Sequence, residues 1–202
     1  NTLVGRFAEI AVQLQPKIII MENVPDLLAK KHWHHFQVFK DTVEAAGYHI
    51  AVKILGMADY GTPQSRFRTV VVAAKDFIPT LPEPVFRPEQ YRTVRDAIGK
   101  LPPLKAGEKD LKDPMHVTSR HRKETIEILK QVPKDGGNRP YGVGPQCLDK
   151  VEGFYDVYGR LAWDKTAVTI TARCRTPSCG RFVHPEQDRG LSVREAALLQ
   201  GF

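Results

Sequence analysis

Two short stretches of the chain carry side chains that could do chemistry on a ligand. The stretch MENVP sets the carboxylate of Glu22 beside the carboxamide of Asn23. The stretch DYGTPQSRFR puts Gln64, Arg66 and Arg68 at alternating positions. A carboxyl group accepts hydrogen bonds or donates a proton, and an arginine presents a fixed fork of charged donors. If one sheet holds both stretches, an acid and a pair of guanidinium groups meet at the same rim.

Strands should position these side chains. The β-branched run KIIIMEN, bounded by Pro16 and Pro25, predicts a buried strand with the acid and the carboxamide at its carboxyl end, where open α/β sheets place ligands. RTVVVAA predicts another strand, so the three alternating side chains of the second stretch should project from one face. Two other interpretations stay open: the polar pair only caps the following turn, and the basic residues only form a solvated edge.

Periodicity predicts the elements around these strands. An amphipathic helix ending at Pro16 is predicted by apolar residues three and four apart, Leu3, Phe7, Ile10, Ala11 and Leu14. A second helix, closed by Gly47, is predicted by the stripe Phe36, Phe39, Val43 and Ala46. HIAVKIL adds a strand, so this part reads as an α/β pattern. Ser192 and Glu195 have the capping-box spacing of a closing helix.

The chain changes character near residue 80. Six prolines fall between Pro79 and Pro103, a density that regular elements do not tolerate, which predicts the exit from a first domain. The charge is +2 over residues 1–80 and +5 over residues 81–202. Segment 160–181 has five basic residues against one acid, too many uncompensated cations for a core, namely Arg160, Lys165, Arg173, Arg175 and Arg181. We expect this segment to face a polyanion.

Composition narrows the class of protein. Of 202 residues, 42% are apolar and 26% charged, and no apolar run approaches the roughly 20 residues of a membrane helix. Three widely spaced cysteines make no disulfide framework, which favours a reducing compartment. Cys174 and Cys179 lack a second ligand pair, so we expect no metal site. The net charge of +7 favours a polyanionic partner and no membrane.

Three segments resemble consecutive signature motifs of the DNA (cytosine-5) methyltransferases, in the family's order: PKIIIMENVPDLL, ADYGTPQSRFRTVVVAA and RGLSVREAALLQGF. VYGRLAWDKTAVTIT and GRFVHPEQDRGLS resemble the recognition-domain end of bacterial members. The resemblance implies that residues 1–80 are the later half of a Rossmann-like methyltransferase sheet. Residues 81–190 would form a smaller, mixed or irregular target-recognition domain, and residues 191–202 a helix that returns to the catalytic domain.

The resemblance also implies a reaction. The family transfers a methyl group from S-adenosylmethionine to C5 of a cytosine flipped out of double-stranded DNA. The family's catalytic Pro-Cys dipeptide and Gly-rich cofactor loop are not in this sequence, and Pro145-Gln146-Cys147 has neither the order nor the place of that dipeptide. The start at Asn1, without an initiator Met, predicts a piece of a longer chain. We expect most of the cofactor pocket on an upstream segment, in cis or as a second chain, and no activity from this segment alone.

Family positions imply roles at the flipped base. Glu22 would face N3 and the exocyclic amine, and Arg68 would hold the charge that builds on O2. Arg66 would bind phosphate or its neighbouring carboxylates. Gln64 would contact the DNA strand near the gap that the flipped base leaves. Asn23 would fix the loop that carries the family's catalytic cysteine, which is not in this sequence.

Further positions concern DNA and cofactor. Thr169 would fix the backbone beside the flipped nucleotide. Segment 160–181 would contact DNA through Arg173, Arg175 and Arg181. Leu3 matches a position that lines the cofactor pocket, although an ordinary helix-core leucine is the other interpretation.

Two other functions fit the same motifs. One is a non-catalytic DNA-binding subunit that supplies specificity to a split methyltransferase. The other is an RNA-directed relative. Such relatives have short recognition segments, whereas the segment here, residues 81–190, runs to 110 residues, so this function is disfavoured. The expected location is the bacterial cytoplasm, in association with the nucleoid.

Overall fold

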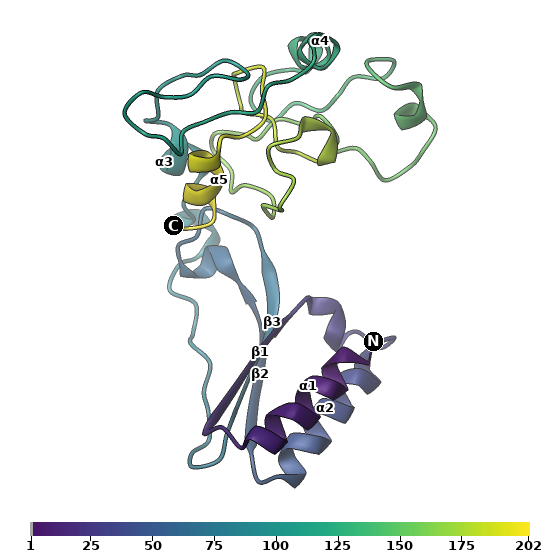
Figure 1. Cartoon of the computed structure of the whole chain (residues 1–202), viewed down its shortest axis with the longest axis vertical. Coiled ribbons are helices and arrows are strands. Elements are labelled where there is room, and N and C mark those ends of the chain that lie inside the picture. Colours follow the sequence, from purple (N-terminus) through teal and green to yellow (C-terminus); the bar gives the residue numbers. More distant parts are fainter. Residues whose placement is uncertain (1) are drawn as a thin grey trace. The chain divides into compact units, whose positions relative to one another are not determined.

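Helices and strands fill the first part of the chain, whereas loops dominate the rest (Figure 1). The computed structural model describes residues 2–202 and divides the chain into two compact units. Unit 1 holds the chain up to Asp59 together with Phe67–Val85. Unit 2 holds Tyr60–Arg66 together with Phe86–Phe202.

Unit 1 combines a small sheet with two helices. The helices are α1 (Leu3–Leu14) and α2 (Trp33–Ala45), and two 3₁₀ turns follow β1 and β2, η1 (Pro25–Leu28) and η2 (Met57–Tyr60). The three strands lie in the order β1-β3-β2, with bounds β1 (Ile18–Asn23), β2 (His49–Gly56) and β3 (Phe67–Ala74). Both outer strands run antiparallel to β3. The predicted α/β class and these elements are confirmed, and the sheet is a small antiparallel one.

The antiparallel pairing brings distant parts of the sequence to one edge. Glu22 stands opposite Val70, and Leu55 stands opposite Arg68. The carboxyl ends of β1 and β2 therefore meet the amino end of β3. Because directly opposed residues share a face and strand side chains alternate, Glu22 and Arg68 project from the same face of the sheet.

Both helices cover one face of this sheet (Figure 1). The shared core contains the predicted stripe of α2, with Phe36 2%, Phe39 0% and Val43 0% exposed. The remaining core residues come from α1 and the strands, chiefly Val4, Ala8, Ala11, Ile19, Met21, Val71 and Ala73. Gly47 follows α2 at φ +86°, a left-handed conformation that suits the predicted helix end.

The core face of α1 differs from the prediction. Only Ala11 of the predicted stripe is buried, and Leu3, Ile10 and Leu14 are 74%, 56% and 75% exposed. The buried positions carry small side chains, which let the helix axis approach its neighbours closely. The periodic stripe of larger residues therefore lies on the outer surface of unit 1.

Strand β1 is buried on one face only. Ile19 and Met21 face the helices, whereas Ile18 and Ile20 are 45% and 66% exposed. The predicted buried strand is thus buried on one face only, because the helices of the described chain cover a single face of the sheet. The strand also pairs along one edge only, with β3.

Unit 2 is built mainly from loops. Its helices are α3 (Val94–Ile98), α4 (Lys123–Gln131) and α5 (Val193–Leu199), with 3₁₀ turns η3 (Pro88–Gln90), η4 (Gln146–Asp149) and η5 (Pro177–Cys179). Within its described residues, isolated bridges take the place of a sheet. Residues 191–202, predicted to return to the first domain, cluster with unit 2.

The start of α5 has the predicted capping box. The Ser192 hydroxyl accepts the Glu195 N–H at 3.0 Å, and the Glu195 carboxylate accepts the Ser192 N–H at 2.7 Å. Each group satisfies a donor that the first turn leaves open.

Candidate functional site

The structure brings Glu22 and Arg68 into direct contact in unit 1. Arg68 Nε donates to Glu22 Oε1 at 2.8 Å, and Arg68 Nη1 donates to the Phe67 carbonyl at 2.7 Å. The Arg68 side chain is 17% exposed, while that of Glu22 is 53% exposed. The guanidinium is therefore held in place from two sides, and the carboxylate is the more exposed of the two groups.

Asn23 turns its side chain toward the following loop instead. Its Oδ1 accepts the Val24 N–H at 2.9 Å. This contact is the turn cap that the sequence left open for the polar pair. It applies to Asn23, whereas the neighbouring Glu22 pairs with Arg68.

A pocket of about 370 Å³ lies beside the acid. Its wall is mostly apolar, and its polar lining residues are Glu22 and Asn23 of β1. The apolar lining residues are Leu3, Val4, Phe7, Ile20 and Met21. The exposed position of Leu3, predicted to line a cofactor pocket, is thus on the rim of this hollow.

Gln64 is buried in unit 2. Its side chain is 2% exposed; Nε2 donates to the Leu199 carbonyl at 3.1 Å and Oε1 accepts the Ile170 N–H at 3.0 Å. Strand β3 begins only at Phe67, so the predicted alternation of three side chains on one strand face is wrong. In this conformation Gln64 positions loops and offers no free group to DNA. Arg66 is half-buried in the same unit.

Thr169 helps to hold the same segment of chain. Its hydroxyl donates to the Ser65 carbonyl at 2.9 Å, and the Ser65 N–H donates to the Ala167 carbonyl at 2.8 Å. The short segment before β3 is therefore fixed along the chain that contains Thr169.

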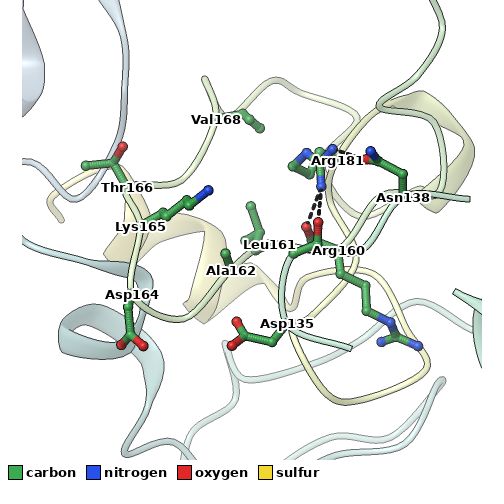
Figure 2. A pocket seen from close by; sticks show the side chains of 11 residues that line it. Asp135, Asn138, Arg160, Leu161, Ala162, Asp164, Lys165, Thr166, Val168 and Arg181 are labelled. Carbon is green, nitrogen blue, oxygen red and sulfur yellow. Dashed lines mark hydrogen bonds between the residues drawn. The ribbon is translucent and has the colours of Figure 1, made fainter. Parts of the chain in front are cut away.

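Segment 160–181 lines a hollow of about 620 Å³ in unit 2 (Figure 2). Figure 2 shows the Lys165 side chain pointing into this hollow. Arg173 is exposed, and Arg175 is half-buried with its Nε lacking a hydrogen-bond partner. The segment thus presents cations, although fewer than its composition predicts.

Arg160 contradicts the prediction that all five cations face outward. Its side chain is fully buried, donates to four backbone carbonyls and pairs with Asp188 at 2.5 Å. A core guanidinium is tolerated when its donors are satisfied in this way. Arg181 is also largely occupied, because it donates to the Gly136 and Arg160 carbonyls at 2.9 Å each and to Asn138.

A buried charge network that includes Glu195 of α5 was not predicted from the sequence. Arg189 binds Glu195 through two hydrogen bonds of 2.7 Å, and both side chains are at most 1% exposed. Burial raises the pKa of Glu195, but the contacts with Arg189 outweigh it and hold that pKa below its ordinary value. His184 lies 3.9 Å from Glu195, and burial lowers the pKa of His184 to about 3. The capping-box spacing was the available signal, and it located Glu195 alone.

Known proteins match this sequence along its whole length. Residues 1–202 fit the family model of the C-5 cytosine-specific DNA methylases. The chain belongs to this family.

Bacterial members of the C-5 cytosine-specific DNA methylases are among its relatives. The type II methylase M.HgiDII of Herpetosiphon aurantiacus is 39% identical over 99% of this chain and 58% of that protein. The type II methyltransferase M1.HphI of Haemophilus parahaemolyticus is 36% identical over 100% of this chain and 52% of that protein. The chain therefore spans little more than half the length of these relatives.

Solved structures share the fold of this methylase chain. A prophage-encoded protein of E. coli, assigned as a DNA modification methyltransferase, aligns with a TM-score of 0.64 at 21% identity, over 98% of this chain and 62% of that one. The Dnmt2 methyltransferase of S. pombe aligns with a TM-score of 0.51 at 16% identity, over 93% of this chain and 54% of that one.

Two classes of site are not found in the described chain. Across residues 2–202, no three His, Cys, Asp or Glu side chains are grouped as a metal site would need. No helix in those residues has the length and apolar character to cross a membrane.

Proposed function

We propose that this chain is part of a DNA (cytosine-5) methyltransferase that transfers a methyl group from S-adenosylmethionine to C5 of a cytosine flipped out of duplex DNA. The observation that carries the proposal is the contact between Glu22 and Arg68. Methyl transfer to cytosine would use a group that donates to N3 and a stable cation at the neighbouring O2. The two residues supply these groups from one face of one sheet.

Glu22 acts on the amidine edge of the base. Its carboxyl group donates to N3 as that nitrogen becomes more basic, and its second oxygen accepts from the exocyclic amine. The Glu22 side chain is 53% exposed, so an incoming ring can approach it. Arg68 holds the charge that develops on O2; its guanidinium stays charged and is already oriented by Glu22 and by the Phe67 carbonyl.

The chain offers part of a cofactor site. The pocket beside Glu22 has apolar walls that suit an adenine or a methionine methylene chain. Leu3, Phe7 and Ile20 would hold the cofactor there. S-adenosylmethionine, when bound, supplies the methyl group as an electrophile. The rest of its pocket belongs to an upstream segment, since this sequence has no Gly-rich cofactor loop.

Exposed apolar surface in unit 1 supports an upstream partner segment, in cis or as a second chain. The outer face of α1 exposes Ile10 and Leu14, and the open face of β1 exposes Ile18. A helix that is apolar on both faces normally packs on both sides. The unpaired edge of β1 also has free backbone groups that another strand would satisfy.

Unit 2 is the proposed target-recognition domain. Arg173 and Arg175 supply cations for phosphates, and Arg181 shapes the loop through its carbonyl contacts. Thr169 and Gln64 hold the stretch of chain that precedes β3 and contains Arg66. Bacterial cytoplasm, with its accessible nucleoid, is the proposed location.

Replacing Glu22 with Gln in the chain joined to an upstream methylase segment tests the proposal. The variant keeps the shape but lacks the transferable proton, so the rate should fall by roughly 10²- to 10⁴-fold while DNA affinity is retained. Tritium transfer from labelled S-adenosylmethionine to DNA measures the rate.

Glu44→Gln is the matched control, because Glu44 makes an exposed i,i+4 contact with Lys40 in the same unit. This variant should keep the full rate, and the 202-residue chain without its upstream segment should transfer no methyl group. A Glu22→Gln rate within a few-fold of wild type would reduce Glu22 to a structural partner of Arg68.

A further inference from the structure

Segment 138–155 of unit 2 forms a loop around a hollow of its own. This hollow measures about 530 Å³ and is lined only by residues of that segment, namely Asn138, Arg139, Tyr141, Leu148, Asp149, Lys150, Val151, Glu152, Phe154 and Tyr155. We call the segment the aromatic loop. It lies outside segment 160–181, so the proposed DNA contacts do not account for it.

The floor of the aromatic loop is fixed. Arg139 and Asp149 pair at 2.8 Å with side chains only 9% and 10% exposed. Arg139 Nη1 also donates to the Val143 carbonyl at 2.7 Å. Leu148 packs against the small apolar core of Leu129 and its neighbours. The hollow is therefore built on a buried ion pair and an apolar anchor.

The rim of the aromatic loop exposes large rings. Tyr141, Phe154 and Tyr155 are 87%, 55% and 71% exposed. In the described chain none of these three rings stacks on another aromatic ring, and neither tyrosine hydroxyl makes a hydrogen bond. Exposed aromatic side chains gathered around one hollow are typical of a binding surface, whereas apolar residues scattered singly over a surface are not.

The charges of the hollow favour a neutral ligand. Arg139 is matched by Asp149, and Lys150 is matched in number by Glu152, so the lining carries no net charge. An isolated phosphate gains little from such a lining. A flat ring with polar edges fits such a lining better, because its faces stack on the aromatic side chains and its edges hydrogen-bond to the hydroxyl and charged groups.

We propose that the aromatic loop binds an unstacked nucleobase of the DNA. The volume exceeds that of one base, and the loop belongs to the unit proposed to contact DNA, so the inference rests on the proposed function. The base bound here is distinct from the cytosine addressed by Glu22, which is in unit 1. A base displaced elsewhere in the recognition site would be held by stacking on Tyr141 and Phe154.

Fluorescent duplexes test the inference with the purified chain. One duplex carries a single bulged 2-aminopurine, and its control carries the same 2-aminopurine fully paired. The chain should bind the bulged duplex more tightly and quench its fluorescence. Tyr141→Ala or Phe154→Ala should reduce that preference by roughly 5- to 150-fold, the range for losing one base-stacking ring.

Two control variants test whether the aromatic ring itself is responsible for the preference. Tyr141→Phe keeps the ring and should keep the preference. Leu111→Ala removes a fully exposed apolar side chain of the same unit, at 101% exposure, and should also keep it. All four substitutions are at exposed positions, so the folded structure should survive them.

Each alternative occupant gives its own result. Equal affinity for bulged and paired duplexes, or binding to neither, overturns the inference and leaves the proposed function intact, because that function is tested separately by Glu22→Gln in the joined chain. Quenching of free 2-aminopurine riboside without preference for the bulged duplex would assign the hollow to a free nucleoside instead. A fall from dimer to monomer in Tyr141→Ala would assign the rings to a second copy of the chain and also overturn the inference.

Discussion

Lowering the pH from 7 to 5 should destabilise unit 2 through His184. This side chain is 3% exposed, and its Nδ1 accepts N–H groups from Glu186 and Gln187 at 3.1 and 3.0 Å. A nitrogen that accepts two N–H donors has no room for a proton of its own. Burial is the largest cause that lowers the pKa of His184 to about 3; the charge of Glu195 opposes it, and the charges of Arg189 and Arg160 act in the same direction as burial.

The magnitude follows from the difference between the folded and unfolded pKa. The unfolded histidine has a pKa of about 6.5, so below that pH the unfolded state binds a proton that the folded state rejects. Stability is therefore complete above about pH 6.5 and falls as the pH drops toward 3. Between pH 7 and pH 5 the loss amounts to about 2 kcal/mol. His121, whose pKa burial also lowers, adds to the loss in the same direction.

The pH window separates the histidine from the carboxylates. The pKa of Glu195 is held low by Arg189, and that of Asp113 is lowered to about 2 by its hydrogen bond with Arg194. Carboxylates with lowered pKa values lose their stabilising effect mainly below pH 5, where the unfolded groups take up protons. A change confined to pH 5–7 therefore reports histidine protonation.

Urea unfolding followed by Trp163 fluorescence measures the effect. The Trp163 ring contacts His184 edge-on at a centroid distance of 5.3 Å, and Trp33→Phe removes the other tryptophan, which lies in unit 1. His184→Gln retains an acceptor oxygen and should abolish most of the pH dependence, while His49→Gln in unit 1 should leave it unchanged. Unfolding free energies at pH 7 and pH 5 that agree within about 0.5 kcal/mol, or a His184→Gln variant with the full pH dependence, would contradict this role of His184.

The remaining predictions concern the arginines of segment 160–181. If Arg173 and Arg175 neutralise phosphates, changing either to Ala should reduce the slope of log affinity against log salt by about 0.9; unchanged slopes and affinities for both variants would place this part of the segment away from DNA. Arg160→Met should cost about 3–5 kcal/mol in urea unfolding, because it leaves buried carbonyls and Asp188 without their donor, whereas the exposed control Arg173→Met should cost less than about 0.5 kcal/mol. Equal costs for these two Met variants would contradict the core role of Arg160.

Elements of unit 1 could be predicted because their signals are local. The stripe of α2 has apolar residues on one face only, so its periodicity identifies the buried face without tertiary information. Helix α1 has apolar residues on both faces, so periodicity identified the helix but not the face that packs. The size of the side chains decided it: Ala8 and Ala11 fit against the sheet, and Leu14 stays outside.

The burial of individual polar residues could not be predicted from composition. Segment 160–181 reads as a basic surface, yet Arg160 lies in the core because four carbonyls and Asp188 surround it, and those acceptors come from residues 24 to 31 positions away. Gln64 is buried for the same reason, since Leu199 and Ile170 supply its partners. Long-range hydrogen-bond partners of this kind leave no trace in the sequence near the residue that they hold.

The contact between Glu22 and Arg68 connects sequence signal and fold. Each residue alone has an ordinary explanation, a turn cap for the acid and a solvated edge for the arginine. Their 46-residue separation means that only the antiparallel pairing of β1 with β3 brings them together. An exposed ion pair of this kind contributes little to stability, typically less than about 1 kcal/mol, so folding gives weak reason to build it. A ligand that needs an acid and a cation at one rim gives a stronger reason, and Glu22→Gln distinguishes the two, because loss of a structural pair lowers stability slightly while loss of a ligand contact lowers the rate by orders of magnitude.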